Sequence, residues 1–104
     1  MKRDPTDAIF TALADATRRR VIRALSEQGP ATATGLAANL PVTRQAVTKH
    51  LRVLENTGLV RHEKRGREVL YELDPERLQD ARAFIDTVSA RWDRAIERLR
   101  RLVE

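Results

Sequence analysis

An uninterrupted apolar seam near the C-terminal end constrains the fold of this 104-residue chain more than any other feature. From residue 75 to residue 103, apolar residues recur at alternating spacings of three and four, which places them on one side of a single helix. Asp74 and Pro75 suit the N-cap and the first position of that helix. Its length predicts a rod of roughly 40 Å. The seam residues are Leu78, Ala81, Ile85, Val88, Trp92, Ala95, Leu99 and Leu102.

So long a seam is more than a small domain covers by itself. A chain of this length builds a single core, and we expect only the first turns of the helix to pack on it. The rest of the seam is predicted to meet a second copy of the chain, as apolar heptad positions do in coiled coils. Packing of the whole seam on the chain's own core is the alternative.

The first half of the chain is predicted to form four short helices separated by caps and helix breakers. Asp15 and Thr43 are suited to cap the second and fourth helices. Gly29 with Pro30 ends the second helix, and Gly58 ends the fourth. Two short helices joined by the turn at Pro41 form a helix-turn-helix arrangement. The expected helices span residues 7–14, 16–27, 34–39 and 43–57.

The fourth expected helix has two faces of opposite character. On a helical wheel Val47, Leu51 and Leu54 lie on one side, which must face the core, and polar residues lie on the other. The first turns of such a helix enter the DNA major groove. Arg and Gln suit base edges, whereas Lys and Arg farther along suit phosphates, and His50 lies at the border of the apolar face. The predicted DNA-contacting residues are Thr43, Arg44, Gln45, Thr48, Lys49, His50 and Arg52.

A change of period after Gly58 predicts a basic β-hairpin. Residues 59–63 and 68–73 are the expected strands, and Gly66 supplies the backbone freedom that the turn between them needs. Residues 43–67 hold seven of the 20 Lys and Arg and two of the 15 Asp and Glu, so the net excess of +5 lies in a quarter of the chain. That concentration is the footprint of a polyanion site. The hairpin residues predicted to contact DNA are Lys64, Arg65 and Arg67.

Several classes of function have no support in the sequence. The chain has no Cys, which excludes a disulfide, a thiolate metal site and a Cys nucleophile. His50 and His62 have no third partner at metal-ligand spacing, and neither has a nucleophile beside it. No catalytic set or Gly-rich phosphate loop is present, so neither an enzyme nor a cofactor is predicted. The run Arg18–Arg20 is expected either to be solvated or to contribute one or two contacts to DNA phosphates.

Four segments together resemble the ArsR/SmtB family of bacterial repressors, and the resemblance covers roughly residues 8–103. It implies a winged-helix homodimer joined through the first and last helices. It also implies a two-fold symmetric operator and repression that an inducer relieves. The segments are residues 12–19, 42–55, 58–60 and 70–74. The interface that the resemblance implies comprises Ile9, Phe10, Leu13, Ile85, Val88, Trp92, Leu99 and Leu102.

The departures from that family bear on the signal that the chain senses. Many members bind metals through Cys pairs on the third helix, where this chain has Thr32 and Thr34, and Thr is a poor ligand for soft metals. Other members use His and carboxylates on the last helix, which has Asp86, Asp93 and Glu97 here but no His. No metal site is therefore predicted. A metal-responsive regulator of the same fold, and a winged-helix module that binds protein instead of DNA, remain alternatives.

We therefore predict one mainly α-helical domain, residues 1–104, with about five helices and a two-stranded wing. Residues 7–73 form the DNA-binding core, in which residues 59–73 are the wing, and residues 75–103 form the dimerisation helix. The predicted partners are double-stranded DNA and a second copy of the chain. The chain has no apolar run long enough for a membrane span and no signal-peptide pattern after Met1, which predicts a cytoplasmic protein. The inducer stays unidentified.

Overall fold

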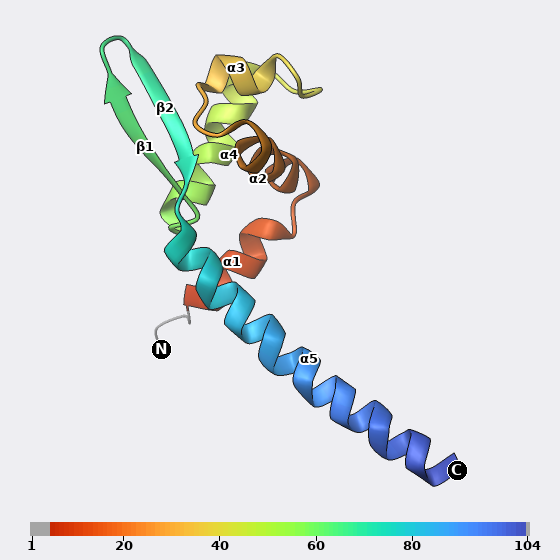
Figure 1. Cartoon of the computed structure of the whole chain (residues 1–104). Coiled ribbons are helices and arrows are strands. Elements are labelled where there is room, and N and C mark those ends of the chain that lie inside the picture. The colour runs from red at the N-terminus through yellow and green to blue at the C-terminus, as the bar shows by residue number, and fades with distance from the viewer. Residues whose placement is uncertain (1–4, 104) are drawn as a thin grey trace.

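The computed structural model describes residues 5–103, which form five helices and one two-stranded antiparallel sheet (Figure 1). The prediction of a mainly α-helical fold with a hairpin is confirmed. Residues 1–4, where no signal peptide is predicted, lie outside the described residues. No helix in the described part of the chain is long and apolar enough to cross a membrane. The elements are α1 (Pro5–Leu13), α2 (Ala16–Gln28), α3 (Ala33–Ala37), α4 (Arg44–Asn56), β1 (Val60–Arg65), β2 (Glu68–Leu73) and α5 (Pro75–Val103).

Four of the helices begin at a side chain that caps the backbone; in α5 this is Asp74, whose carboxylate accepts the N–H of Glu76 at 3.1 Å. The side chains of Asp15, Thr32 and Thr43 each accept a hydrogen bond from the N–H three residues later, at 3.0–3.1 Å. The caps at Asp15, Thr43 and Asp74 are as predicted. The third helix begins one residue earlier than the expected start at Thr34, because Thr32 is its N-cap.

The first strand of the wing ends two residues later, and the turn is tighter, than the pattern indicates. The pairing of Arg65 with Glu68 leaves Gly66 and Arg67 as a two-residue turn. Gly66 has φ 61°, as the first central residue of a type II′ turn requires. Lys64 and Arg65, expected in the turn, therefore belong to β1.

A short backbone link ties the wing to the helices. Tyr71 of β2 pairs with Ala31, which precedes α3, through N···O distances of 2.8 and 3.0 Å. The wing is thus held at its middle, and its tip extends beyond α3 and α4 (Figure 1).

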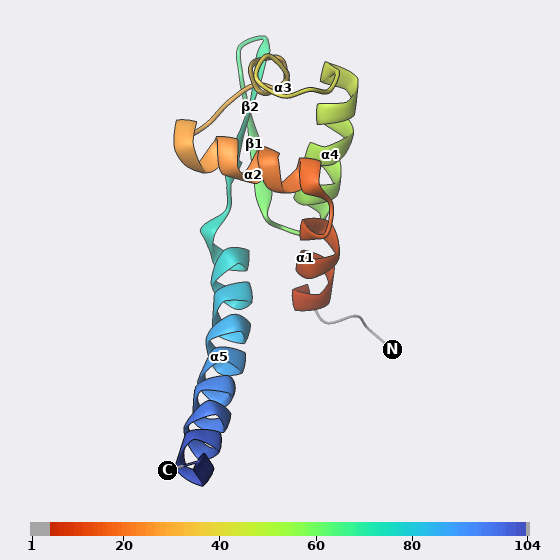
Figure 2. The same cartoon turned by 90° about the vertical axis from the view of Figure 1, so that its right-hand side faces the viewer.

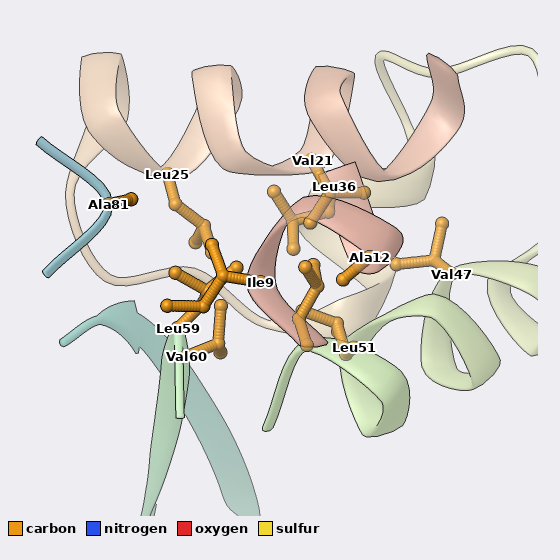
Figure 3. Close-up of a cluster of buried hydrophobic side chains, with 11 residues drawn as sticks. Ile9, Ala12, Val21, Leu25, Leu36, Val47, Leu51, Leu59, Val60 and Ala81 are labelled. Carbon is orange, nitrogen blue, oxygen red and sulfur yellow. The ribbon is translucent and has the colours of Figure 1, made fainter. Parts of the chain in front are cut away.

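The hydrophobic core lies beneath the helix-turn-helix, and all five helices contribute to it (Figure 3). α4 supplies its aliphatic face, as predicted, whereas α5 supplies only Ala81 among the buried positions. This division leaves most of α5 outside the core. The buried residues are Ile9, Ala12, Val21, Leu25, Leu36, Val47, Leu51, Leu54, Leu59, Val60 and Ala81.

Helix α5 extends away from the rest of the chain as a rod (Figures 1 and 2). Its first turns pack on α1, where the rings of Phe10 and Phe84 meet edge to face at 5.4 Å. The radius of gyration is 17.7 Å, against about 13 Å for a compact chain of about 100 residues. The seam therefore does not pack as a whole on the chain's own core. The exposed large apolar residues of α5 are Phe84, Ile85, Trp92, Ile96, Leu99, Leu102 and Val103.

Candidate nucleic-acid interface

The outer side of α4 presents a continuous polar surface, which we call the recognition face. It follows from the burial of Val47, Leu51 and Leu54, because those side chains occupy the opposite side of the helix and are fully buried. The surface is a shallow groove of about 340 Å³. The structure thus brings together five of the residues predicted to contact DNA: Arg44, Gln45, Thr48, Lys49 and Arg52.

The two threonines at the start of α4 already serve the helix itself. The Thr43 hydroxyl accepts the N–H of Ala46 at 3.1 Å. The Thr48 hydroxyl donates to the carbonyl of Arg44 at 3.0 Å, so its methyl group and a lone pair remain for a ligand. By contrast, the Arg44 guanidinium and the Gln45 amide form no hydrogen bond within residues 5–103, so their donors and acceptors are open to a ligand.

His50 lies apart from the recognition face. It is half-buried and does not line the groove. Its neighbour is Asp15 at the start of α2: the N–H of Arg18 is the main cause that lowers the pKa of Asp15 below its ordinary value of 3.8, and His50 adds to that lowering. The position of His50 at the contact of α2 with α4 therefore does not support the predicted DNA contact.

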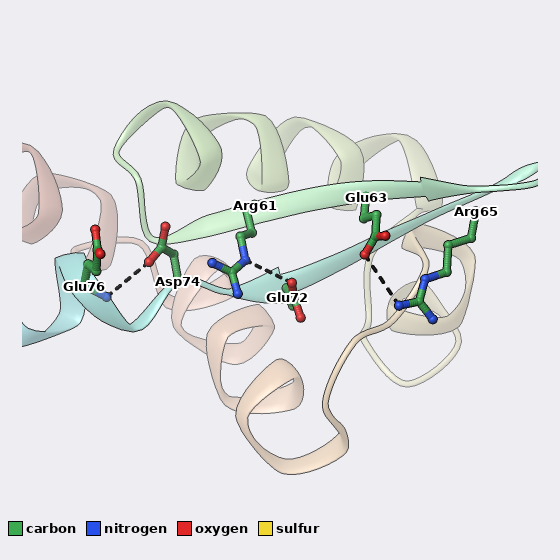
Figure 4. A network of polar contacts seen from close by, with 6 residues as sticks. All are labelled: Arg61, Glu63, Arg65, Glu72, Asp74 and Glu76. Atoms are coloured by element: carbon green, nitrogen blue, oxygen red, sulfur yellow. Dashed lines mark hydrogen bonds and ion pairs between the residues drawn. The ribbon is translucent and has the colours of Figure 1, made fainter.

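The wing has two unlike faces because neighbouring strand residues point to opposite sides. Arg61, Glu63 and Arg65 lie on the outer face, away from α4 (Figure 4). Arg61 Nε bonds Glu72 Oε1 at 2.9 Å, a contact that raises the pKa of Arg61, and Arg65 Nη2 lies 3.5 Å from Glu63 Oε2. Two of the wing cations are thus already paired with carboxylates.

The inner face of the wing turns toward α4. His62 of β1 contacts Glu55 of α4 and lies against the ring of Tyr71, at a centroid distance of 5.7 Å. Lys64 is two residues farther along β1, opposite Val69, and so shares this inner face. These contacts join the middle of the wing to the C-terminal turn of α4.

A groove of about 540 Å³ separates the inner side of β2 from α3 and the start of α4. Arg44 lines it on the α4 side and Arg67 on the wing side, with Glu68 as the one acidic residue in the lining. Thr34 and Tyr71 also line it, although the sequence pattern does not single them out as site residues. Their place depends on the pairing of Tyr71 with Ala31, for which the sequence gives no signal. The remaining lining residues are Thr32, Ala33, Thr48 and Val69.

The ion pairs show which of the cations in residues 43–67 are already paired with acidic residues. Of the seven cations in residues 43–67, Arg61 and Arg65 pair with acids on the outer face of the wing. The other five form no ion pair within the described residues, and they lie on α4 or at the inner side and tip of the wing. The unpaired positive charge therefore lies on the recognition face and on the wing, and Arg44 and Arg67 place some of it on the two sides of the groove. These five are Arg44, Lys49, Arg52, Lys64 and Arg67.

Within the described part of the chain, no three His, Cys, Asp or Glu residues lie close enough together to hold a metal ion. Thr32, at a position where the resemblance places a metal ligand, uses its hydroxyl oxygen to cap α3.

The residues predicted for a dimer interface differ in how much of their surface is free. Ile9 is fully buried inside the single chain, so it belongs to the core and we remove it from the predicted interface. Phe10 and Leu13 are half-buried, and Phe10 contacts Phe84 of α5. Helix α5 also exposes large apolar residues outside the seam, namely Phe84, Ile96 and Val103. The other predicted residues are partly or largely exposed: Ile85, Val88, Trp92, Leu99 and Leu102.

A helix-turn-helix whose second helix turns a polar face outward, followed by a basic hairpin beside that helix, defines a winged helix-turn-helix protein. A family model described as a helix-turn-helix domain matches residues 13–63. The HTH-type transcriptional regulator Rv2034 of Mycobacterium tuberculosis is 38% identical over 98 residues, which are 94% of this chain and 88% of that protein. The transcriptional repressor SdpR of Bacillus subtilis is 27% identical over 73 residues, which are 70% of this chain and 80% of that protein.

A solved structure of an ArsR-like transcriptional regulator from Rhodococcus sp. RHA1 superposes with a TM-score of 0.77 at 34% identity, covering 96% of this chain and 93% of that one. The chain belongs to the ArsR/SmtB family of transcription regulators.

Proposed function

We propose that the protein is a dimeric repressor that binds double-stranded DNA at a two-fold symmetric operator. The observation that carries this proposal is the recognition face: five polar residues on α4 with two fully available side chains, Arg44 and Gln45, in its first turn. A winged-helix module that binds only protein would have no need for unpaired cations on both sides of the groove.

The residues divide into two groups by their chemistry. Arg44 and Gln45 are suited to base edges, because a guanidinium can bond guanine and an amide can bond adenine through two hydrogen bonds each. Thr48 keeps its methyl group, which suits contact with thymine. The remaining unpaired cations suit phosphate oxygens, which set the register of the protein on the duplex. These are Lys49, Arg52, Lys64 and Arg67.

A second copy of the chain is the proposed occupant of the α1–α5 surface. The exposed stripe on α5 includes Trp92, which is 65% exposed in the single chain, and it runs to the end of the helix. An apolar stripe of this length rarely stays exposed in a soluble monomer. A two-fold dimer would present two recognition faces to one duplex, which matches an operator with two equivalent half-sites.

The proposal is tested by selecting DNA from a random duplex library with the intact protein. We expect enrichment of inverted repeats, with half-sites spaced by about one turn of DNA or a multiple of it. A variant with Arg44→Ala and Gln45→Ala should enrich no sequence while still binding DNA weakly through its remaining cations. Failure of the intact protein to enrich any sequence would contradict the proposal.

The same selection, repeated with zinc, nickel or cadmium ions, addresses the metal-responsive alternative. Loss of enrichment with one of these ions would assign a metal as the inducing signal. Equal enrichment in all samples would leave the inducer to be sought among other ligands.

A further inference from the structure

Two of the three arginines at the start of α2 turn back to the end of α1. Arg18 Nε donates to the carbonyl of Ala12 at 2.7 Å, and Arg19 Nη1 donates to the carbonyl of Leu13 at 2.6 Å. Arg20 is exposed and forms no hydrogen bond or ion pair within residues 5–103. Arg18 and Arg19 are therefore engaged by backbone carbonyls of the chain, whereas the neighbouring Arg20 is not.

The carbonyls that these arginines bind need partners from outside α1. The last carbonyls of a helix have no partner within it, and they form the negative end of the helix dipole. Helices α2 and α4 each have a glycine with φ 81° just after them, Gly29 and Gly58. Helix α1 is followed by Ala14 instead, and two guanidinium groups satisfy its end. Such charge-assisted bonds are stronger than bonds between neutral groups.

The same short segment also starts α2. Only Ala14 and Asp15 connect the two helices, and the Asp15 carboxylate accepts the backbone N–H of Arg18 at 3.0 Å. Together, the side chains of residues 15, 18 and 19 therefore supply hydrogen-bond partners for free carbonyls at the end of α1 and for a free N–H at the beginning of α2. Figure 2 shows that α1 turns away from α2 at this junction.

The junction lies between the proposed dimer surface and the recognition helix. On one side, α1 packs on α5 through Phe10 and Phe84. On the other side, α2 packs on α4, the helix that carries the recognition face. A change in the angle between α1 and α2 would therefore move α4 relative to the dimer axis.

We propose that Arg18 and Arg19 are positioning residues for operator binding, which hold the angle between α1 and α2 and so place the two recognition helices about the dimer axis. The inference rests on the proposed function. A rotation at the junction would displace the second recognition helix from its groove while the first remains bound. These arginines then act without touching phosphate, unlike the solvated or phosphate-bound run that the sequence predicts.

The DNA test compares R18Q and R19Q with R20Q, a matched control that removes the same charge from the neighbouring position. The probes are an inverted repeat selected by the intact protein and the same duplex with one half scrambled. We expect R18Q and R19Q to bind the inverted repeat roughly tenfold more weakly. Their affinity for the half-site and the salt dependence of binding should stay unchanged. R20Q should behave like the intact protein on both probes.

Two results would overturn the positioning role. If affinity for both probes falls equally and the salt slope drops by about one unit per arginine, the side chains contact phosphates instead. If neither affinity changes, they contribute nothing to binding. Because Arg19 is exposed, R19Q keeps the test usable if R18Q unfolds.

A second measurement needs no DNA. The chain has no Cys, so spin labels can be placed specifically by D7C on α1 and E27C on α2, both at exposed positions. The label-to-label distance distribution should broaden when R18Q and R19Q are combined and stay narrow with R20Q. An unchanged distribution would refute the role of the arginines at the junction. If the intact protein selects no inverted repeat, the proposed function fails. The label-to-label distances still show whether Arg18 and Arg19 hold the angle between α1 and α2.

Discussion

Gln45 lies in the first turn of α4 with its amide unbonded, so its full hydrogen-bonding capacity is open to a base edge. We expect Gln45→Ala to weaken binding to the selected operator by roughly tenfold or more, because a bidentate contact to a base contributes about 1–3 kcal/mol of discrimination. Binding to random DNA should hardly change. Titrations of both duplexes with the variant, monitored by fluorescence anisotropy, measure the two affinities.

The matched control for this change is Gln79→Ala, which removes the same amide from an exposed position on α5. It should leave both affinities unchanged. If Gln45→Ala weakens operator and random DNA equally, Gln45 contacts the DNA backbone and not a base.

Arg65 and Arg67 are two residues apart, yet the structure gives them different surroundings. Arg67 lines the groove opposite Arg44, whereas Arg65 lies on the outer face of the wing beside Glu63. We expect Arg67→Ala to reduce the slope of log affinity against log salt by about one unit, the value for one lost phosphate contact. Arg65→Ala should reduce it less. Affinities measured over a series of salt concentrations give both slopes, and equal reductions would mean that the outer face also meets DNA.

Asp15 makes the stability of the fold depend on pH at the acid end. Its pKa is lowered below 3.8, chiefly by the N–H of Arg18, so its contribution to stability is complete above pH 3.8 and declines as pH falls through the lowered pKa. Asp15→Asn keeps a side-chain oxygen for the cap and removes the titration. The stability advantage of the intact protein over this variant should therefore shrink below pH 3.8 in thermal unfolding. An advantage that grows with acidity would contradict this account.

At the residue scale, the sequence predicts which side chains gather on α4 but not how the charged ones are used. The helical period alone puts Arg44 and Gln45 on the outer face, because the aliphatic residues must be buried. Lys64 and Arg65 point to opposite faces of the wing because both belong to β1. The sequence pattern assigns both residues to the turn and so does not predict this difference. The role of Arg18 depends on where the chain turns after α1, a property of tertiary packing.

At the scale of elements, the recognition helix depends on its first cap. The Thr43 hydroxyl accepts the N–H of Ala46 at 3.1 Å, which satisfies one of the four free N–H groups at the start of α4. We expect Thr43→Ala to lower the free energy of unfolding by about 1 kcal/mol, whereas Thr43→Ser, which keeps the hydroxyl, should lower it much less. Thermal unfolding at one protein concentration measures both changes. Equal melting temperatures for the two variants would show that the cap contributes nothing.

Elements with local signals are predicted well from the sequence, and elements that depend on distant partners are not. Helices α2 and α4 have a capping side chain at one end and a glycine at the other, so their bounds agree with prediction to about a residue. Helix α3 is only five residues long, too short for its period to locate its start. The link between Ala31 and Tyr71 joins residues 40 apart in the sequence and leaves no mark in either segment.

At the scale of the whole molecule, the sequence predicts the main feature of the shape: a helix too long for its own core. The structure extends over 64 Å along one axis and 21 Å along the shortest, because α5 carries its apolar seam away from the other elements. The other elements form the core almost without α5, since α1 supplies Ile9 and Ala12 to it and α5 supplies only Ala81. One chain therefore forms a DNA-binding unit and a separate apolar surface.

Leu99 offers the clearest test of that surface, because it is 62% exposed in the single chain and its replacement disturbs no internal packing. We expect Leu99→Glu to produce monomers, since a carboxylate buried between two apolar stripes without a partner is strongly unfavourable. Ala90→Glu, at an exposed position outside the stripe, is the matched control and should stay dimeric. Light scattering gives the mass, and the fluorescence of Trp92, the one Trp of the chain, should shift to the red when it becomes exposed to water. The monomer should keep its affinity for a half-site and lose the added affinity of the inverted repeat, whereas a dimeric Leu99→Glu protein would show that this part of α5 does not join the two copies.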